Sequence, residues 1–589
     1  MKPSIGLFAL ILFCIFTGFS CATTLTARNL PSDKSGECSG QGFLVDKDNC
    51  LCFSGYSGSH CEVSSLNVPI YVKSIRNGKI RKKDISIADK DELGNALILA
   101  SGNGQLRLTE TLLKYGADLD YRDAGGRTPL IWSSIRGDDG ISVLLLSKGV
   151  DPDIQDTCGK RSALMFAAQL GHYEVAQSLL NAKPAVDLTD DDGRTAMFYS
   201  ARYDHSDIVS LLLSNGSDAN HKDKDGLTPF ILAAVKGNIG ILKVLRIHIN
   251  NIDESDSTGM TALHHAVLQN EIDTIHFLLS NKADPNVKDN DGWTPLIFAS
   301  NEGNIEASKI ILDFSPSIDE GDNDGFTPLM HAAMEGKIDV LKLLLQKGAD
   351  KYRLNDKGWS ALSAAAFKGQ KESVQLLSPA EPNTGQDVDL LANALLLAVF
   401  ASEEEIVDAL IITDKNHVAF DKFGERILDS AVLSGSLEMV EKILKTGEFQ
   451  KEGNTAFASA LMIGAENGYL EIVEELLDSG FEVDATNDDG KTALILAANN
   501  GHADVVKLLI SKGANVDVET KTGKWTALMR AVENGHIDTV KILLNSGTNL
   551  EAKNADGSTA IDLSKKSKNL DIESLLINSE SEHKATHDK

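Results

Sequence analysis

The chain has 589 residues, of which 42% are apolar and 24% are charged, and its formal net charge is −28. This composition is typical of folded globular proteins and excludes the disordered and fibrous classes. The excess of carboxylates repels phosphate backbones, which argues against nucleic acid as a partner and favours basic protein surfaces.

The first predicted element is a targeting segment. One lysine is followed by a continuous apolar run over residues 5–19 and then by small residues ending at Ala22. About fifteen apolar residues suit the core of a signal peptide, whereas a membrane span needs about twenty. We therefore predict a signal peptide over residues 1–22. Two alternatives are an uncleaved signal anchor and a lipoprotein site at Cys21, which is weakened by Gly18 where that motif has leucine.

A cysteine-rich segment comes next. Cys50 and Cys52 are one residue apart, and the eight residues FSGYSGSH separate Cys52 from Cys61. This pattern resembles the C-terminal half of an EGF-like module, and Cys38-Ser-Gly-Gln-Gly resembles the region around the second cysteine of that family. Four cysteines could instead bind zinc, but C-x-C is tighter than the spacing typical of zinc ligands, so no metal site is predicted.

The EGF-like resemblance implies a small disulfide-rich module over residues 23–62, in an oxidising compartment. It implies two bridges, Cys38 to Cys50 and Cys52 to Cys61. The chain departs from the family at the third cysteine, because the position near Phe43 or Leu44 has no thiol, and Cys21 is the first cysteine only if it survives cleavage. Residues 63–90 are expected to form a linker or an N-terminal cap.

From residue 91 onward the sequence is periodic. A glycine-x-threonine or serine motif recurs in the forms GRTPL, GRTAM, GLTPF, GMTAL, GWTPL, GFTPL and GWSAL, beginning at Gly126, Gly193, Gly226, Gly259, Gly292, Gly325 and Gly358. Each step is 33 residues, apart from the first interval, which contains the variant GKRSAL at Gly159.

One unit, residues 322–354, shows what the repeat encodes. Thr327 can cap a helix that begins at Pro328, and Gly336 can end it. A second helix follows with apolar residues at three-to-four spacing and ends at Gly348. Two helices this short cannot bury a core alone, so each unit must be stabilised by stacking on its neighbours.

These units resemble ankyrin repeats, with the family's TPLH-like motif at Thr261-Ala-Leu-His264. The resemblance covers residues 91–577, about fifteen units. It implies an all-α repeat solenoid of helix-turn-helix units with β-hairpin fingertips. Trp132, Phe166, Tyr199 and Phe298 share one position on the first helices and are expected to pack between repeats.

The repeat pattern weakens in the middle of the array. Pro379 and Pro382 stand where a fingertip strand should lie, and Arg426-Ile427 replaces Thr-Pro in the following unit. We therefore predict a break over residues 379–388, with one array before it and another after it. The arrays are residues 91–378 and 389–577, followed by a polar tail over 578–589. The apolar stretch 390–401 is about twelve residues long, which is too short to span a bilayer, and is expected to be a buried helix.

No catalytic or cofactor-binding site is predicted. Gly490-Lys-Thr492 resembles the end of a P-loop, but Ala485 stands where that motif needs glycine. His264 and His265 occupy structural positions of the repeat, so metal binding is not expected. Acidic turns such as DDDG lack the bidentate glutamate of calcium loops. The sequence therefore indicates a protein that is not an enzyme and has no cofactor and no metal.

Two columns of apolar residues indicate a binding surface. The ankyrin resemblance implies that the residue after each fingertip glycine faces solvent near the concave surface, and a second exposed position follows the alanine pair of the first helix. The first column reads Leu227, Met260, Trp293, Phe326 and Trp359, and the second reads Val235, Leu268, Asn301, Met334 and Phe367. Exposed apolar patches of several hundred Å² usually mark binding sites. The alternative is that these residues only pack on neighbouring loops.

The compartment follows from cysteine usage. The array contains a single cysteine, Cys158, and such a chain tolerates an oxidising environment. Asn215-Gly-Ser217 is a candidate glycosylation site. We predict a secreted or surface-exposed monomer that binds another protein; the alternative is an intracellular or membrane-tethered scaffold with an uncleaved N-terminal anchor.

Overall fold

The computed structural model describes residues 90–380, 384–413, 418–446 and 458–587, together with the backbone of four short strands between residues 42 and 63. The predicted signal peptide, residues 1–22, lies outside the described residues. Two compact units divide the chain at Pro295 and Leu296, and each is described by itself.

The four strands form two antiparallel pairs. β1 (Gly42–Asp46) pairs with β2 (Asn49–Cys52), with Leu44 opposite Cys50, and β3 (Tyr56–Ser57) pairs with β4 (Glu62–Val63). Of the cysteines predicted to form disulfides, Cys38 and Cys61 lie outside the described residues, and only the backbone is described for the two on β2.

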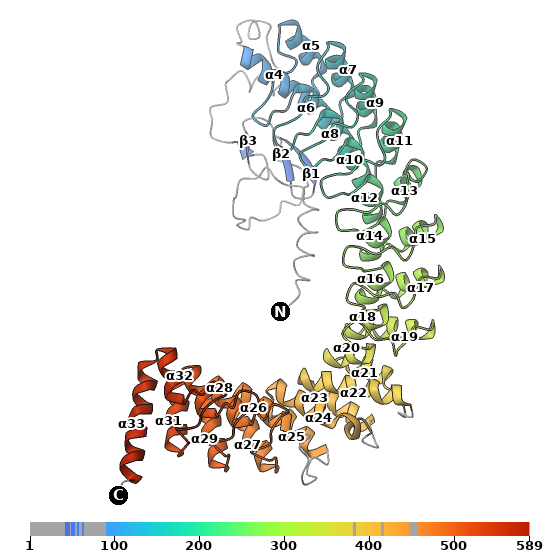
Figure 1. The fold of residues 1–589 in the computed structure, drawn as a ribbon. Helices are drawn as coiled ribbons and strands as arrows, with labels where there is room; N and C mark the ends of the chain where they lie inside the picture. The colour runs from blue at the N-terminus through green and yellow to red at the C-terminus, as the bar shows by residue number, and fades with distance from the viewer. Residues whose placement is uncertain are drawn as a thin grey trace. The chain divides into compact units, whose positions relative to one another are not determined.

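The first unit is a stack of helix pairs. Its first helices are α4 (Lys90–Gly102), α6 (Pro129–Arg136), α8 (Ala163–Leu170), α10 (Ala196–Arg202), α12 (Pro229–Val235) and α14 (Ala262–Leu268). Its second helices are α5 (Leu106–Lys114), α7 (Asp139–Ser147), α9 (Tyr173–Asn181), α11 (Ser206–Ser214), α13 (Ile239–Arg246) and α15 (Ile272–Ser280). First helices pack on first helices and second on second, which gives two layers (Figure 1).

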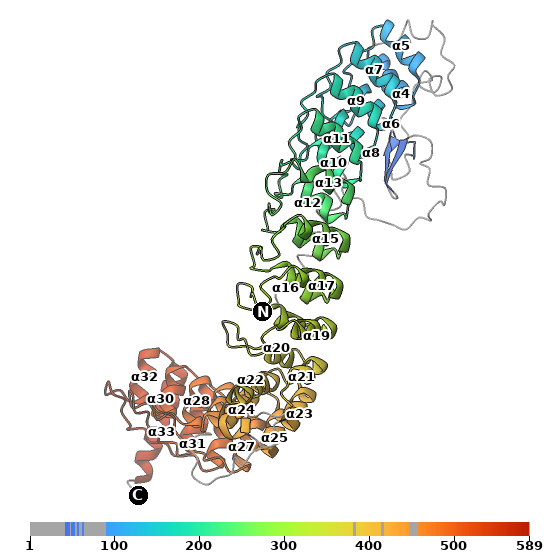
Figure 2. The same ribbon diagram turned by 90° about the vertical axis from the view of Figure 1, so that its right-hand side faces the viewer.

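The second unit repeats this architecture. Its first helices are α16 (Pro295–Glu302), α18 (Pro328–Met334), α20 (Ala361–Phe367), α22 (Gly385–Phe400), α24 (Val418–Ser434), α26 (Ala458–Asn467), α28 (Ala493–Asn500), α30 (Ala527–Glu533) and α32 (Ala560–Ser567). Its second helices are α17 (Ile305–Asp313), α19 (Ile338–Gln346), α21 (Lys371–Leu377), α23 (Glu404–Thr413), α25 (Leu437–Thr446), α27 (Leu470–Asp478), α29 (Ala503–Ser511), α31 (Ile537–Asn545) and α33 (Leu570–His587). The two rows can be followed from the side in Figure 2.

The helix boundaries follow the predicted signals. The Thr327 side chain accepts a hydrogen bond from the Met330 backbone N–H at 3.3 Å, and Pro328 is the first residue of α18. Gly348 follows the second helix of that repeat at φ +93°, a left-handed conformation that glycine adopts without a steric penalty. The alanines of the first helices are buried, so neighbouring helices approach closely and form the core.

The fingertips differ from the predicted β-hairpins. Among the described residues of the arrays, the only strand-like pairings are the isolated bridges Gln155–Ser162 and Ser255–Thr261. Most of these turns are closed by a side-chain oxygen of an aspartate or an asparagine, which accepts hydrogen bonds from backbone N–H groups of the turn. A ladder of strand hydrogen bonds is therefore not needed. The hairpin part of the prediction is therefore wrong, and the fingertips are tight turns.

The repeats near the predicted break have a different form. α22 has 16 residues and α24 has 17, whereas α18, α20 and α30 have seven. Thr384 and Asp387 form a capping box at the start of α22, and the Tyr352 hydroxyl donates to Asp387 at 2.9 Å. The first helix is thus extended on the N-terminal side, where other repeats have a fingertip turn.

The stack is continuous on both sides of the predicted break. α20 packs on α22, and α21 packs on α23. Pro379 directly follows the turn that ends α21, while Pro382 lies outside the described residues. The division between compact units falls at residues 295 and 296, and the break over residues 379–388 stays a prediction. No helix that the structure describes between residues 90 and 587 combines the length and apolar character needed to cross a bilayer.

Candidate partner-binding surface

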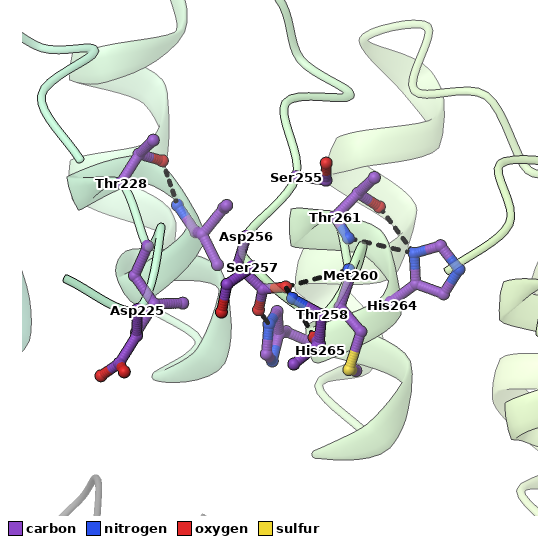
Figure 3. A network of polar contacts seen from close by, with 12 residues as sticks. Asp225, Thr228, Ser255, Asp256, Ser257, Thr258, Met260, Thr261, His264 and His265 are labelled. Atoms are coloured by element: carbon purple, nitrogen blue, oxygen red, sulfur yellow. Dashed lines mark hydrogen bonds and ion pairs between the residues drawn. The ribbon is translucent and has the colours of Figure 1, made fainter. Parts of the chain in front are cut away.

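Most fingertips are organised around one side-chain oxygen of an aspartate or asparagine, and the fingertip at Asp256 is an example. The Asp256 Oδ1 atom accepts hydrogen bonds from the backbone N–H groups of Thr258 at 2.9 Å and Met260 at 3.0 Å (Figure 3). Gly259 has φ +84°, which lets the chain turn back toward the first helix. The Ser257 N–H donates to the carbonyl oxygen of Asp225 in the preceding fingertip at 2.9 Å. Adjacent fingertips of this unit are therefore joined by backbone hydrogen bonds.

The fingertip column is buried at its N-terminal end. Leu227 is 9% exposed and Met260 is 5% exposed, so the expectation that these two side chains face solvent is wrong. The hydrogen-bonded fingertip of the next repeat lies against each of these turns, which leaves little room for water. Trp293, Phe326 and Trp359 are partly exposed, as a contact surface requires.

The first-helix column shows the same division. Val235 is 6% exposed and belongs to the core, contrary to the sequence expectation. Leu268, Met334 and Phe367 are partly exposed, as is the asparagine at position 301. The surface that remains accessible is therefore smaller in the first unit than the sequence pattern predicts.

In the second unit the two columns meet in an aromatic cluster. The rings of Phe326 and Trp359 have centroids 6.1 Å apart at an interplanar angle of 75°. The rings of Trp359 and Phe367 are 4.9 Å apart at 54°. The first contact is edge-on and the second is tilted, and both centroid distances are in the favourable range for aromatic pairs. The alternative that these residues pack on neighbours is thus correct for their mutual contacts, yet all three stay partly exposed.

Sequence reasoning missed two members of the first-helix column. Phe400 is 49% exposed and Leu433 is 48% exposed, and they continue the 33-residue spacing from Phe367. The 33-residue spacing is the signal that could have identified them, and the lack of a fingertip motif in the next repeat obscures it. We call Met334, Phe367, Phe400 and Leu433 the apolar column of the second unit.

The histidines of the repeats have structural contacts. The His265 Nε2 atom lies 2.7 Å from the Asp256 Oδ2 atom, and the His331 Nε2 atom lies 3.0 Å from the Asp322 Oδ2 atom. Burial tends to raise the pKa of Asp256, but hydrogen bonds from His265 and Thr258 outweigh it and hold the pKa below its usual value. The same balance, with His331 as partner, holds the pKa of Asp322 low.

His264 contacts both its own repeat and the next fingertip. Its Nδ1 atom accepts from the Thr261 backbone N–H at 3.1 Å, and its Nε2 atom lies 3.1 Å from the carbonyl oxygen of Trp293. Burial lowers the pKa of His264 to about 4, so the imidazole is neutral at physiological pH. The structural role predicted for this histidine is confirmed by these contacts.

The position of His265 carries other donors in earlier repeats. The Trp132 indole N–H donates to Asp123 at 2.9 Å, and the Tyr199 hydroxyl donates to Asp190 at 2.7 Å. Trp132 and Phe166 are buried, as predicted for packing between repeats, while Tyr199 and Phe298 are partly exposed. In these repeats, the residue at this position of the first helix contacts the aspartate of its own fingertip through its side chain. Sequence periodicity alone did not indicate this contact.

Asn215, the predicted glycosylation site, is exposed at the end of α11. Its side-chain amide donates to the Leu211 carbonyl oxygen at 2.9 Å, and the Ser217 hydroxyl donates to Asp187 at 2.6 Å. Cys158 is partly exposed. Within the part of the chain that the structure describes, no three His, Cys, Asp or Glu side chains gather in a metal-binding arrangement.

A stack of helix pairs with equivalent side chains in register is a helical repeat solenoid. Most pairs here are preceded by a turn that is closed by hydrogen bonds to a side-chain oxygen. The family model described as ankyrin repeats (three copies) matches residues 72–156, 137–223, 203–289, 275–355, 362–455, 461–554 and 515–587. The chain belongs to the ankyrin-repeat family. Ankyrin repeats generally bind other proteins and are typically non-enzymatic, so the array is a protein-interaction scaffold by family.

Curated relatives match over short stretches. The chain is 35% identical over 103 residues to the ankyrin repeat and KH domain-containing protein mask-1 of Caenorhabditis elegans, which is 17% of this chain and 4% of that protein. It is 37% identical over 99 residues to the probable E3 ubiquitin-protein ligase XBOS32 of Oryza sativa subsp. japonica, covering 16% of this chain and 20% of that protein. It is 39% identical over 75 residues to the ADP-ribosylation factor GTPase-activating protein AGD2 of Arabidopsis thaliana, covering 13% and 10%. The chain thus spans a fifth or less of the length of these relatives.

Proposed function

We propose that this protein is a non-enzymatic scaffold that binds a partner protein through the fingertip and first-helix face of its second unit. The observation that carries the proposal is the partly exposed aromatic cluster of Phe326, Trp359 and Phe367. Aromatic and methionine side chains commonly supply most of the binding energy of an interface. Rings held by mutual contacts lose little entropy on binding, which favours affinity.

The test uses variants that remove the apolar surface and keep the fold. Trp359→Ser and Phe367→Ser are expected to leave the helical circular dichroism signal unchanged and to weaken capture of a protein partner by about tenfold or more. Leu570→Ser is the matched control, because Leu570 is 74% exposed on α33 and lies outside the cluster. Equal capture by the cluster variants and the control would refute this surface as the binding site.

We further propose that the protein is secreted or surface-exposed, with a cleaved signal peptide over residues 1–22 and an EGF-like module containing the bridges Cys38–Cys50 and Cys52–Cys61. The apolar run at residues 5–19, the C-x-C spacing and the low cysteine content of the array support this proposal. The two short antiparallel strand pairs between residues 42 and 63 are compatible with a small module of this kind. An anchored intracellular scaffold is the competing proposal.

Intact mass of the protein purified from its native source separates the two proposals. Secretion predicts loss of the N-terminal segment 1–22 and four thiols that resist alkylation until the protein is reduced. A full-length chain with freely alkylated cysteines would refute secretion and support the anchored scaffold. Glycosylation at Asn215 would appear in the same spectrum as a mass increment that a glycosidase removes.

A further inference from the structure

The part of the second unit formed by α22 and α24 exposes apolar side chains that the family pattern does not provide. Phe400 ends α22 and Leu433 lies one residue before the end of α24, and both are about half exposed. The extended first helices stand where other repeats have fingertips. The apolar column is partly exposed at Met334 and Phe367 and about half exposed at Phe400 and Leu433, so it is accessible across four consecutive repeats.

A carboxylate lies beside this column. Asp429 is four residues before Leu433 on α24, so the two side chains lie on the same face of the helix. The corresponding residue is Leu396 on α22 and Met462 on α26, so a charged group replaces an apolar one at this position. The Ser459 hydroxyl donates to the Asp429 Oδ1 atom at 2.7 Å, which leaves the second carboxylate oxygen available for another donor.

Hydrogen bonds between helices hold these groups in register. The Ser430 hydroxyl of α24 donates to the Leu396 carbonyl oxygen of α22 at 2.8 Å, and the bond from Ser459 joins α26 to α24. The axes of helices in direct contact, such as these, lie about 10 Å apart. Successive members of the apolar column are therefore separated by roughly the rise of seven residues of an α-helix, which is about 10.5 Å.

Carboxylates, including Asp429, outnumber cations beside the column. Exposed carboxylates near the column belong to Glu335, Glu425 and Glu466, and the exposed cations are Lys368 and Arg426. The whole chain has a net charge of −28, so the long-range field also favours a cationic partner. A binding segment with lysine or arginine beside its apolar face would complement this surface.

We propose that the apolar column of the second unit binds a basic amphipathic helix of a partner protein, with apolar side chains seven residues apart on Phe367, Phe400 and Leu433 and a lysine or arginine on Asp429. This inference rests on the proposed scaffold function and specifies the chemistry of its partner. An apolar helix face laid along a row of apolar side chains buries area without unpaired backbone groups, because the helix satisfies its own hydrogen bonds.

Fluorescence anisotropy with the full-length protein tests the proposal. The probe is a labelled 21-residue helical peptide with leucine on one face and lysine on the other, compared with one in which glutamate replaces every lysine and one in which serine replaces every leucine. The leucine–lysine peptide is expected to bind about tenfold or more tightly than either analogue. Equal binding of the serine–lysine peptide would show that charge alone acts and would overturn the proposal.

Variants place the binding on the column. The double substitution Phe400→Ser and Leu433→Ser should lower the affinity for the leucine–lysine peptide by about tenfold. Asp429→Asn should lower this affinity by about threefold or more. Leu570→Ser, in the terminal helix, should bind as the native protein does, and helical circular dichroism checks that each variant is folded. Affinity of the double variant within about twofold of the native protein would overturn the proposal.

The same variants separate this inference from the scaffold function. Suppose that the double substitution Phe400→Ser and Leu433→Ser abolishes binding of a native partner, but the leucine–lysine peptide does not bind the native protein. This result would overturn the basic-helix inference and leave the scaffold function standing. A native partner that binds every column and cluster variant as well as the native protein would overturn both.

Discussion

Replacing Asp429 with asparagine is expected to stabilise the folded protein above pH 6. Burial raises the pKa of Asp429 to about 6, with a further increase from nearby Glu425, and the hydrogen bond from Ser459 only partly offsets these effects. At neutral pH the carboxylate is therefore ionised at a cost in free energy, which destabilises the folded state. Asparagine has nearly the same shape and keeps an oxygen that can accept the Ser459 hydrogen bond.

The magnitude follows from linkage. An acid whose pKa is raised on folding gives stability that is fully present below its unfolded pKa, near 4, and is lost as pH rises through its folded pKa. The difference between 3.8 and about 6 corresponds to about 3 kcal/mol at pH 7 or above. Because Asp429 is partly exposed, solvent screening reduces the expected gain for Asp429→Asn to about 1–2 kcal/mol.

Urea unfolding followed by circular dichroism at pH 4.5 and pH 7.5 measures this effect. The Asp429→Asn variant should unfold at higher urea than the native protein at pH 7.5. At pH 4.5, which lies between the unfolded and folded pKa values, only about a third of this gain should remain. Asp356→Asn, at an exposed fingertip aspartate, is the control and should change stability by less than about 0.5 kcal/mol. A stability gain of equal size at both pH values would refute the assignment to an ionised, partly buried carboxylate.

Two further predictions concern the repeat architecture. His265→Ala should destabilise the protein by about 3 kcal/mol at neutral pH, because it removes the His265 contact of the buried Asp256 Oδ2 atom. The loss should shrink below about pH 4, since the lowered pKa of Asp256 gives stability only while the carboxylate is ionised. Gly226→Ala should destabilise more than Gly149→Ala: both glycines have positive φ, but an added Cβ at Gly226 would lie 2.6 Å from the Ser257 backbone nitrogen, whereas nothing lies within 4 Å at Gly149. Thermal unfolding compares each pair, and equal losses for the two glycine variants would contradict the close approach of adjacent fingertips.

The cost of the glycine substitutions has two parts. A residue with a side chain in the left-handed region costs about 1–2 kcal/mol, which applies to both positions. The contact with the next fingertip adds to this only at Gly226, so that loss should reach about 3 kcal/mol.

The sequence by itself determined the repeat unit. Pro328 and Gly348 mark boundaries that backbone geometry imposes locally, and the structure places helices between such signals in repeat after repeat. The period of 33 residues likewise identified positions that are equivalent in every unit. Local signals of this kind depend on neighbouring residues in the chain, so no knowledge of distant contacts is needed to read them.

Tertiary structure alone decided which equivalent positions are exposed. Leu227 and Trp359 have the same place in the repeat, yet the first is buried and the second is partly exposed. Phe400 is exposed in a repeat that the sequence marked as irregular, because the first helix there is extended in place of a fingertip. The exposure of each side chain depends on how much of it the adjacent repeat covers, and this contact joins residues some thirty positions apart. Periodicity shows which positions are equivalent, but it does not show how much of each side chain is covered.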